Sequence, residues 1–171
     1  MKSIPEATEE RTWQEFTGFS PDRANKEMRE INNSQPELLP FVVESSKEMG
    51  REVSELAIYQ FVVVYRMFQE SHAKIKKISS EEVIECYKQN EGLLERLDVT
   101  HGKFLDRIAS LQTSKQPHVV NYVVDALTEE DEREDAVTLT NEQKGFLFLL
   151  LKTVVDVLDK KGVNTRRERN G

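Results

Sequence analysis

One ten-residue segment of this chain occurs twice, and this match limits strongly how the chain can fold. Gln35–Glu44 aligns without gaps on Gln116–Asp125, with four identities and four close replacements. The match continues into a second apolar segment, where Phe61–Val64 meets Phe148–Leu151. Each copy therefore predicts a helical hairpin, and the chain uses this hairpin twice.

The second segment of each copy is apolar nearly all round. From Leu56 to Tyr65 only Gln60 is polar, and from Phe146 to Leu151 no residue is. A helix that is apolar on every side must be covered on every side. We therefore expect the two helices side by side at the centre, related by a pseudo-twofold axis. Apolar surface that the other helices leave uncovered would form a homodimer interface.

Apolar residues keep a helical spacing through the rest of the core, and strict alternation is missing. The sequence therefore predicts an all-α fold, a compact helical bundle of two related hairpins over about 35–71 and 116–161. Intervening helices are expected over about 80–97 and 99–114.

Several residues predict where the helices begin and end. Ser79 with Glu82 and Thr140 with Gln143 have the form of capping boxes. The remaining signals are two prolines at first helical positions and a glycine after a last turn: Pro36, Pro117 and Gly162.

The apolar residues are concentrated in one part of the chain. They make up 37% of the whole, and the deficit lies at the two ends. We therefore expect a flexible or loosely docked N-terminal arm over 1–33, a single helical domain over 34–162 and a disordered tail over 163–171.

The net charge of −7 is also unevenly placed. The insertion that lengthens the second hairpin contributes −5 of it, and lacks the spacing of a calcium-binding loop. An acidic loop between two helices is either a solvated connection or a docking point for a basic partner. Its candidate partner-binding residues are Glu129, Glu130, Asp131, Glu132, Glu134 and Asp135.

Trp13, Phe16 and Phe19 are spaced by three in the N-terminal arm. Aromatic residues at one-turn spacing are used as anchors in another protein's groove. The alternative is that they fold back onto the bundle. We include all three among the candidate partner-binding residues.

No catalytic or metal-binding pattern is found in the sequence. His72, His101 and His118 lie in no zinc or di-iron motif, and no glycine-rich phosphate loop is present. Asp98 and His101 share a helix face but would need ligands from a second helix to hold a metal. No cofactor and no metal site are predicted, and the lone Cys86 is expected to be a packed core residue.

Two charged residues interrupt the last apolar helix, where Lys152 can pair with Asp156 one turn later. A functional buried lysine is the alternative to a simple structural pair. Arg66, at the end of the equivalent helix, raises the same question.

Nucleic acid and membranes are not predicted partners. The chain is acidic, and its basic clusters lack interleaved aromatic residues. The most apolar run, Gly145–Leu158, is too short to span a bilayer. The first residues do not form a secretory signal, and a lone thiol fits a reducing compartment, so we expect a cytoplasmic protein.

These observations predict a non-enzymatic interaction or adaptor module that binds another protein, in a monomeric or homodimeric form. The alternative is a helical enzyme or metal-binding protein whose carboxylate and histidine site assembles only in three dimensions.

Overall fold

The computed structural model describes residues 3–72, 74–95, 115–128 and 138–163. Helices dominate these ranges, which confirms the all-α class. They are α1 (Glu6–Thr17), α2 (Pro21–Ser34), α3 (Leu38–Ser46), α4 (Arg51–Ser71), α5 (Ser80–Glu95), α7 (Pro117–Thr128) and α8 (Asn141–Lys161). A short 3-10 turn, Lys47–Met49, links α3 to α4.

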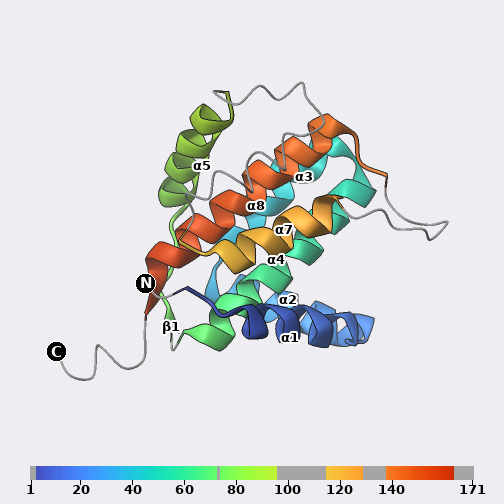
Figure 1. The fold of residues 1–171 in the computed structure, drawn as a ribbon, viewed down its shortest axis with the longest axis vertical. Coiled ribbons are helices and arrows are strands. Elements are labelled where there is room, and N and C mark those ends of the chain that lie inside the picture. Colours follow the sequence, from blue (N-terminus) through green and yellow to red (C-terminus); the bar gives the residue numbers. More distant parts are fainter. Residues whose placement is uncertain (1–2, 73, 96–114, 129–137, 164–171) are drawn as a thin grey trace.

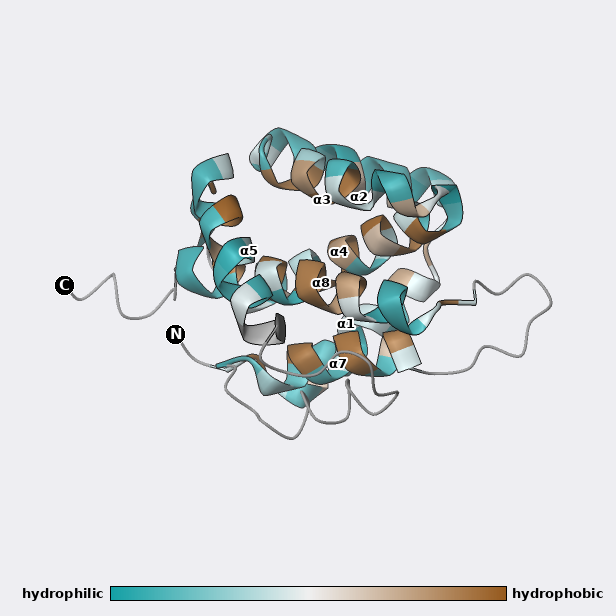
Figure 2. Ribbon diagram, turned by 90° about the horizontal axis from the view of Figure 1, so that it is seen from above, coloured by the Kyte–Doolittle hydropathy of each residue, from teal (hydrophilic) through white to brown (hydrophobic). Residues whose placement is uncertain are grey.

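The helices are arranged in layers around α4 and α8 (Figures 1 and 2). These two helices contact each other in the middle layer. α2 and α3 cover one side of this layer, α1 and α7 cover the opposite side, and α5 packs along α8 at one flank. Segments far apart in the sequence are thus held together by one shared core.

The two middle helices are buried on nearly every side, as their all-round apolar sequences predict. In α4 every side chain from Gln60 to Tyr65 is buried, and in α8 the same holds from Leu147 to Leu151. Removing this much apolar surface from water is the main driving force for folding. Among the described residues, the large apolar side chains left exposed are Tyr59 and Ile84.

The predicted capping boxes are present. Thr140 Oγ1 accepts a hydrogen bond from the Gln143 backbone N–H at 3.1 Å, and the Thr140 N–H donates to Gln143 Oε1 at 2.9 Å. Ser79 and Glu82 form the same pair of bonds at the start of α5. Each box satisfies backbone donors that a helix start leaves free.

The two prolines differ in position. Pro117 is the first residue of α7, as predicted, but α3 starts only at Leu38. Pro36 lies instead in a turn that closes when the Leu38 N–H donates to the Gln35 carbonyl at 3.2 Å. The expectation that Pro36 opens a helix is therefore wrong, because this turn delays the helix start by two residues.

The N-terminal segment, predicted as a flexible or loosely docked arm over 1–33, forms two packed helices in the described residues. Ile4, Phe16 and Ile31 are buried in the same apolar cluster as α4 and α8. The segment has few apolar residues, but these lie where α1 and α2 meet the core. The positions of these few apolar residues along α1 and α2, and not their number, therefore decide that the segment packs on the core.

A two-stranded pairing, which the sequence did not predict, closes one end of the molecule. β1 (Lys74–Ile75) pairs antiparallel with β2 (Gly162–Val163), so Val163 is part of the fold and not of a disordered tail. Residues 164–171, and the helix predicted over 99–114, lie outside the described residues. None of the described helices combines the length and apolar character that crossing a membrane requires.

Candidate functional site

The acidic residues predicted to bind a partner, Glu129 to Asp135, lie outside the described residues. The two ends of their segment are described: Thr128 is the last residue of α7, and Leu139 and Thr140 lead into α8. Leu127 and Leu147, close to these ends, are both buried. The acidic segment is therefore attached at both ends to helices that belong to the core.

The three aromatic residues of the N-terminal segment face the core. Phe16 is buried, with its ring centroid 5.2 Å from Phe19 and 5.0 Å from Tyr59. Trp13 and Phe19 are partly buried against the same apolar cluster. This is the arrangement of a segment folded back onto the bundle, and it leaves Phe16 unable to act as an external anchor.

Arg66 lies at the junction of α1, α2 and α4. Its guanidinium group forms ion pairs with Glu27 of α2 at 2.9 Å, with Glu70 at 3.4 Å and with Glu15 of α1 at 3.9 Å. The Phe19 ring lies 5.0 Å from the same group. Only 14% of the Arg66 side chain is exposed. Arg66 thus links α1 and α2 to α4, and its guanidinium group is engaged in these ion pairs.

Lys152 sits in a polar network between α5 and α8. Its Nζ donates to Asp156 Oδ2 at 2.7 Å, the pair that the sequence spacing predicts, and to Asn90 Oδ1 at 3.0 Å. Asn90 Nδ2 donates in turn to Asp156 Oδ2 at 3.1 Å and to Thr153 Oγ1 at 3.2 Å. Every polar group of this network has a partner, so a buried charge is stabilised without any ligand.

The network borders a cavity of about 230 Å³. Gln116 closes another side of it, with Nε2 donating to Asp159 Oδ1 at 2.8 Å. The cavity is lined by Cys86, Gln89, Asn90, Lys115, Gln116, Lys152, Asp156, Asp159 and Lys160. It is the strongest candidate for a chemical site among the residues that the sequence singled out.

Cys86 is a poor nucleophile in this cavity. The side chain is buried, and burial raises the pKa of the thiol, with a further contribution from Asp156. Because the thiolate is the reactive form, the thiol is kept in its less reactive state at neutral pH. The prediction that Cys86 is a packed core residue agrees with this position.

The histidines do not assemble into a metal centre in the described part of the chain. No group of three or more histidine, cysteine or carboxylate side chains is placed to hold a metal there. His72 is buried at the end of α4, and His118 lies in the first turn of α7. His101 and Asp98 lie outside the described ranges.

A carboxyl group with a shifted pKa lies between α1 and α7. Burial, helped by Glu10, Glu6 and Asp125, raises the pKa of Glu9 to about 7. Burial also raises the pKa of Tyr122, with contributions from Tyr59 and Glu9. The charge of Glu9 thus reaches the Tyr122 phenol across the contact between α1 and α7.

Two glutamines in the fold have roles that the sequence did not predict. Gln35 and Gln116 are both fully buried, and each side-chain Oε1 accepts a backbone N–H from a distant segment. Gln35 accepts from Ile78 at 2.9 Å, and Gln116 accepts from Ile4 at 2.8 Å. The self-match placed both glutamines at its first position, which is the one signal that pointed to them.

The described residues therefore offer a polar cavity in which Lys152, Asn90, Asp156 and Gln116 are hydrogen-bonded to one another or to neighbouring side chains. No protein-family model, curated protein or solved structure matches this chain.

Proposed function

We propose that this protein is a non-enzymatic helical interaction module, and that its acidic segment 129–135 docks a basic protein partner. The observation that carries the proposal is that three basic side chains at or near the core, Arg66, Lys152 and Lys161, are paired within the fold. The largest block of unbalanced charge in the sequence, −5, lies in that one segment. Charge that the fold does not use is available for a partner.

Each of these three side chains has at least one carboxylate partner. Arg66 is held by three carboxylates, and Lys152 is held by Asp156 and Asn90. Lys161 pairs with Glu82 at 2.7 Å, and this contact lowers the pKa of that carboxyl. A catalytic lysine or arginine would need a free functional group facing a substrate, so these contacts support a structural role for each.

The attachment of the acidic segment supports docking. α7 packs along α8, and α8 also contacts α3, α4 and α5. The capping box at Thr140 fixes the residue at which α8 begins. A segment held at both ends by such helices loses less conformational freedom on binding than a free tail does.

We further propose that the chain consists of two related halves, α1–α4 and α5–α8. α1 packs on α4 and α7, while α5 packs on α8 and α3, which are the corresponding contacts under the exchange of halves. The Gln35 and Gln116 bonds correspond in the same way, since each receives the N–H of a buried isoleucine just before a helix. This arrangement supports a repeat longer than the hairpins, in which segment 129–135 is an added feature.

The proposal is tested by changing the charge of the segment alone. Replacing the six acidic residues by their amides, Glu→Gln and Asp→Asn, is expected to abolish co-purification of a partner from the cells of origin. A matched control neutralises six exposed glutamates elsewhere: Glu6, Glu10, Glu44, Glu48, Glu52 and Glu142. Isotope labelling allows the proteins bound to wild type, variant and control to be compared in one experiment.

A partner that is lost from the segment variant and retained by the control supports docking. Equal retention by all three proteins contradicts the role of the segment. Both variants are expected to melt cooperatively, because neither changes a buried residue among those described.

The cavity beside Lys152 favours one second candidate function. A small ligand that displaced Asn90 or Asp156 from Lys152 would free a buried ammonium group for chemistry, which is the alternative in which a site assembles only in three dimensions. Stoichiometric binding of a metal or small molecule that is lost in Lys152→Met would favour this function over the first.

A further inference from the structure

A second cavity, of about 550 Å³, lies at the C-terminal end of α4. The ends of α2 and α4 form one wall, through Asn33, Ser34, Gln69 and His72. Lys74 and Lys77, on either side of Ile75, form the other wall. The β1–β2 pairing holds this second wall in place.

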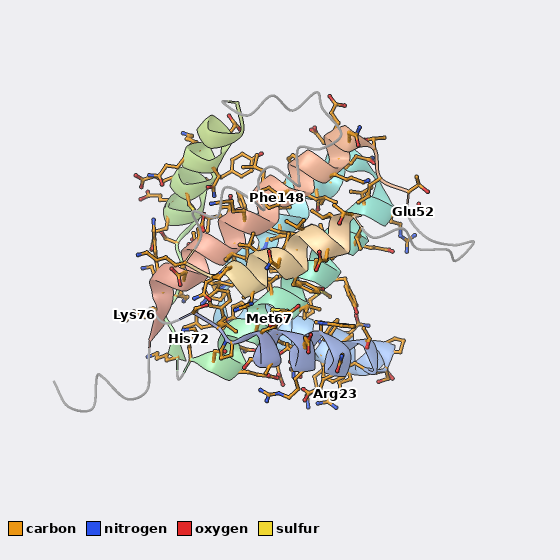
Figure 3. All side chains as sticks on the ribbon, in the orientation of Figure 1. Arg23, Glu52, Met67, His72, Lys76 and Phe148 are labelled. Carbon is orange, nitrogen blue, oxygen red and sulfur yellow. The ribbon has the colours of Figure 1, made fainter. Side chains whose placement is uncertain are left out.

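His72 places a buried imidazole ring at this cavity. The residue is 7% exposed, and its ring stacks on Phe68 with 5.7 Å between centroids. Nδ1 lies 3.0 Å from the Phe68 carbonyl oxygen, so Nδ1 carries the proton and donates. Nε2, the other ring nitrogen, has no hydrogen-bond partner within the described part of the chain. Figure 3 shows His72 at the end of α4, with Lys76 close by in the following segment.

The charges in this cavity favour an anion. Its lining includes two lysines and no carboxylate. The ends of α2 and α4 contribute a partial negative charge of about 0.5 each, according to the helix dipole. Two ammonium groups outweigh this, so the cavity keeps a net positive charge of about one.

The first cavity provides an internal comparison. In the self-match, Tyr65, Gln69 and His72 correspond to Lys152, Asp156 and Asp159, which line that first cavity. There the two carboxylates are already bonded to Lys152 and Gln116. At the corresponding positions of the second cavity the side chains are neutral, so its lysines have no carboxylate partner in the lining.

We propose that the second cavity binds the phosphate group of a small phosphorylated molecule. Lys74 and Lys77 supply charge, and the amides of Asn33 and Gln69 and the hydroxyl of Ser34 supply further donors. A phosphate monoester has three acceptor oxygens and a charge near −2, which matches this set better than a single carboxylate does. The remaining volume, bordered by Ile75 and the buried Tyr65, accommodates an organic group. This proposal is independent of protein docking by segment 129–135.

The proposal is tested by nuclear magnetic resonance titration of the full chain with inorganic phosphate and with phenyl phosphate. Both probes are expected to give saturable shifts at Gln69, His72 and Lys74, and phenyl phosphate is expected to bind more tightly. The double variant Lys74→Gln, Lys77→Gln is expected to weaken binding of both probes by about tenfold or more. Each lysine contributes a charge-assisted hydrogen bond, which stabilises a complex more than a neutral one does. Both lysines are exposed, so the variant is expected to fold.

The matched control is Lys115→Gln with Lys160→Gln, which removes the same charge from the first cavity. It is expected to change the affinity less than about twofold. Shifts that do not saturate, or that weaken equally in both variants, would overturn the proposal, since they would report only the overall charge of the protein.

Discussion

Leu150 is fully buried in the middle of α8, the helix that packs against α4. Leu150→Asp places an unpaired carboxylate there, which costs several kcal/mol. We expect this variant to lose the cooperative thermal transition that wild type shows by circular dichroism. Ile84→Asp, at a residue that is 45% exposed, is the matched control and is expected to melt close to wild type. A Leu150→Asp protein that melts like wild type would mean that α8 is not central.

Glu9 makes stability depend on pH. Burial raises the pKa of this carboxyl in the folded protein to about 7, from 4.5 for an exposed glutamate. The folded state therefore binds more protons than the unfolded state between these two values, and stability falls as pH rises from about 4.5 to 7. Glu9→Gln, which has no titrating carboxyl at this position, is expected to remove this fall in stability. The difference in melting temperature between variant and wild type is expected to be small at pH 4.5 and largest above pH 7.

The size of this effect is limited, because Glu9 is only partly buried and solvent screens its charge. After this discount the difference is expected to be about 1 kcal/mol. The control is Glu44→Gln, at an exposed position of α3. A Glu9→Gln protein whose advantage over wild type is constant from pH 4.5 to 8 would contradict this role.

At the level of single residues, the sequence predicted contacts between neighbours on one helix. The Lys152–Asp156 pair and both capping boxes follow from spacings of three or four residues, and the structure confirms them. Asn90 was not predicted as the partner of Lys152, because 62 residues separate them and only the packing of α5 on α8 brings them together. Gln35 and Gln116 were missed for the same reason.

At the level of helices, Arg66 controls how α1 and α2 attach to α4. Arg66→Gln removes the ion pair of the partly buried Glu27, while Glu70 keeps its contacts with Arg11 and Thr12, and is expected to lower the free energy of unfolding by about 2 kcal/mol. Hydrogen exchange is expected to speed up in α1 and α2 more than in α7. Arg51→Gln, which removes an ion pair on a 91% exposed side chain, is expected to change stability by less than about 0.5 kcal/mol. Equal acceleration in all helices would show that Arg66 supports the whole core and not this attachment.

Helices with a strong apolar stripe were predicted well, while weakly apolar segments were not. α4 and α8 follow from their composition, because an apolar surface on all sides allows only a central position. α1 and α2 were predicted as an arm, since the few apolar residues they contain gave no clear stripe before their positions in the fold were known. β1 and β2 have two residues each, too few for any periodic pattern.

At the level of the whole molecule, the placement of α4 and α8 in contact was predicted, and the positions of α1 and α2 in the layers around them were not (Figure 2). Helical spacing identifies which face of a helix is buried but not which helix covers it. The packing of α5 along α8, and of α1 between α4 and α7, depends on contacts between distant parts of the chain. The functional candidates share this limit, since the lining of each cavity comes from segments that lie far apart in the sequence.

The most direct test of the interaction function is native mass spectrometry of the untagged protein, purified gently from its own source. We predict a complex of this chain with a second protein, without a stoichiometric metal. Because docking on an acidic segment is electrostatic, the complex is expected to dissociate as the salt concentration rises. A spectrum that contains this chain alone, or this chain with a stoichiometric metal and no protein partner, would contradict the account.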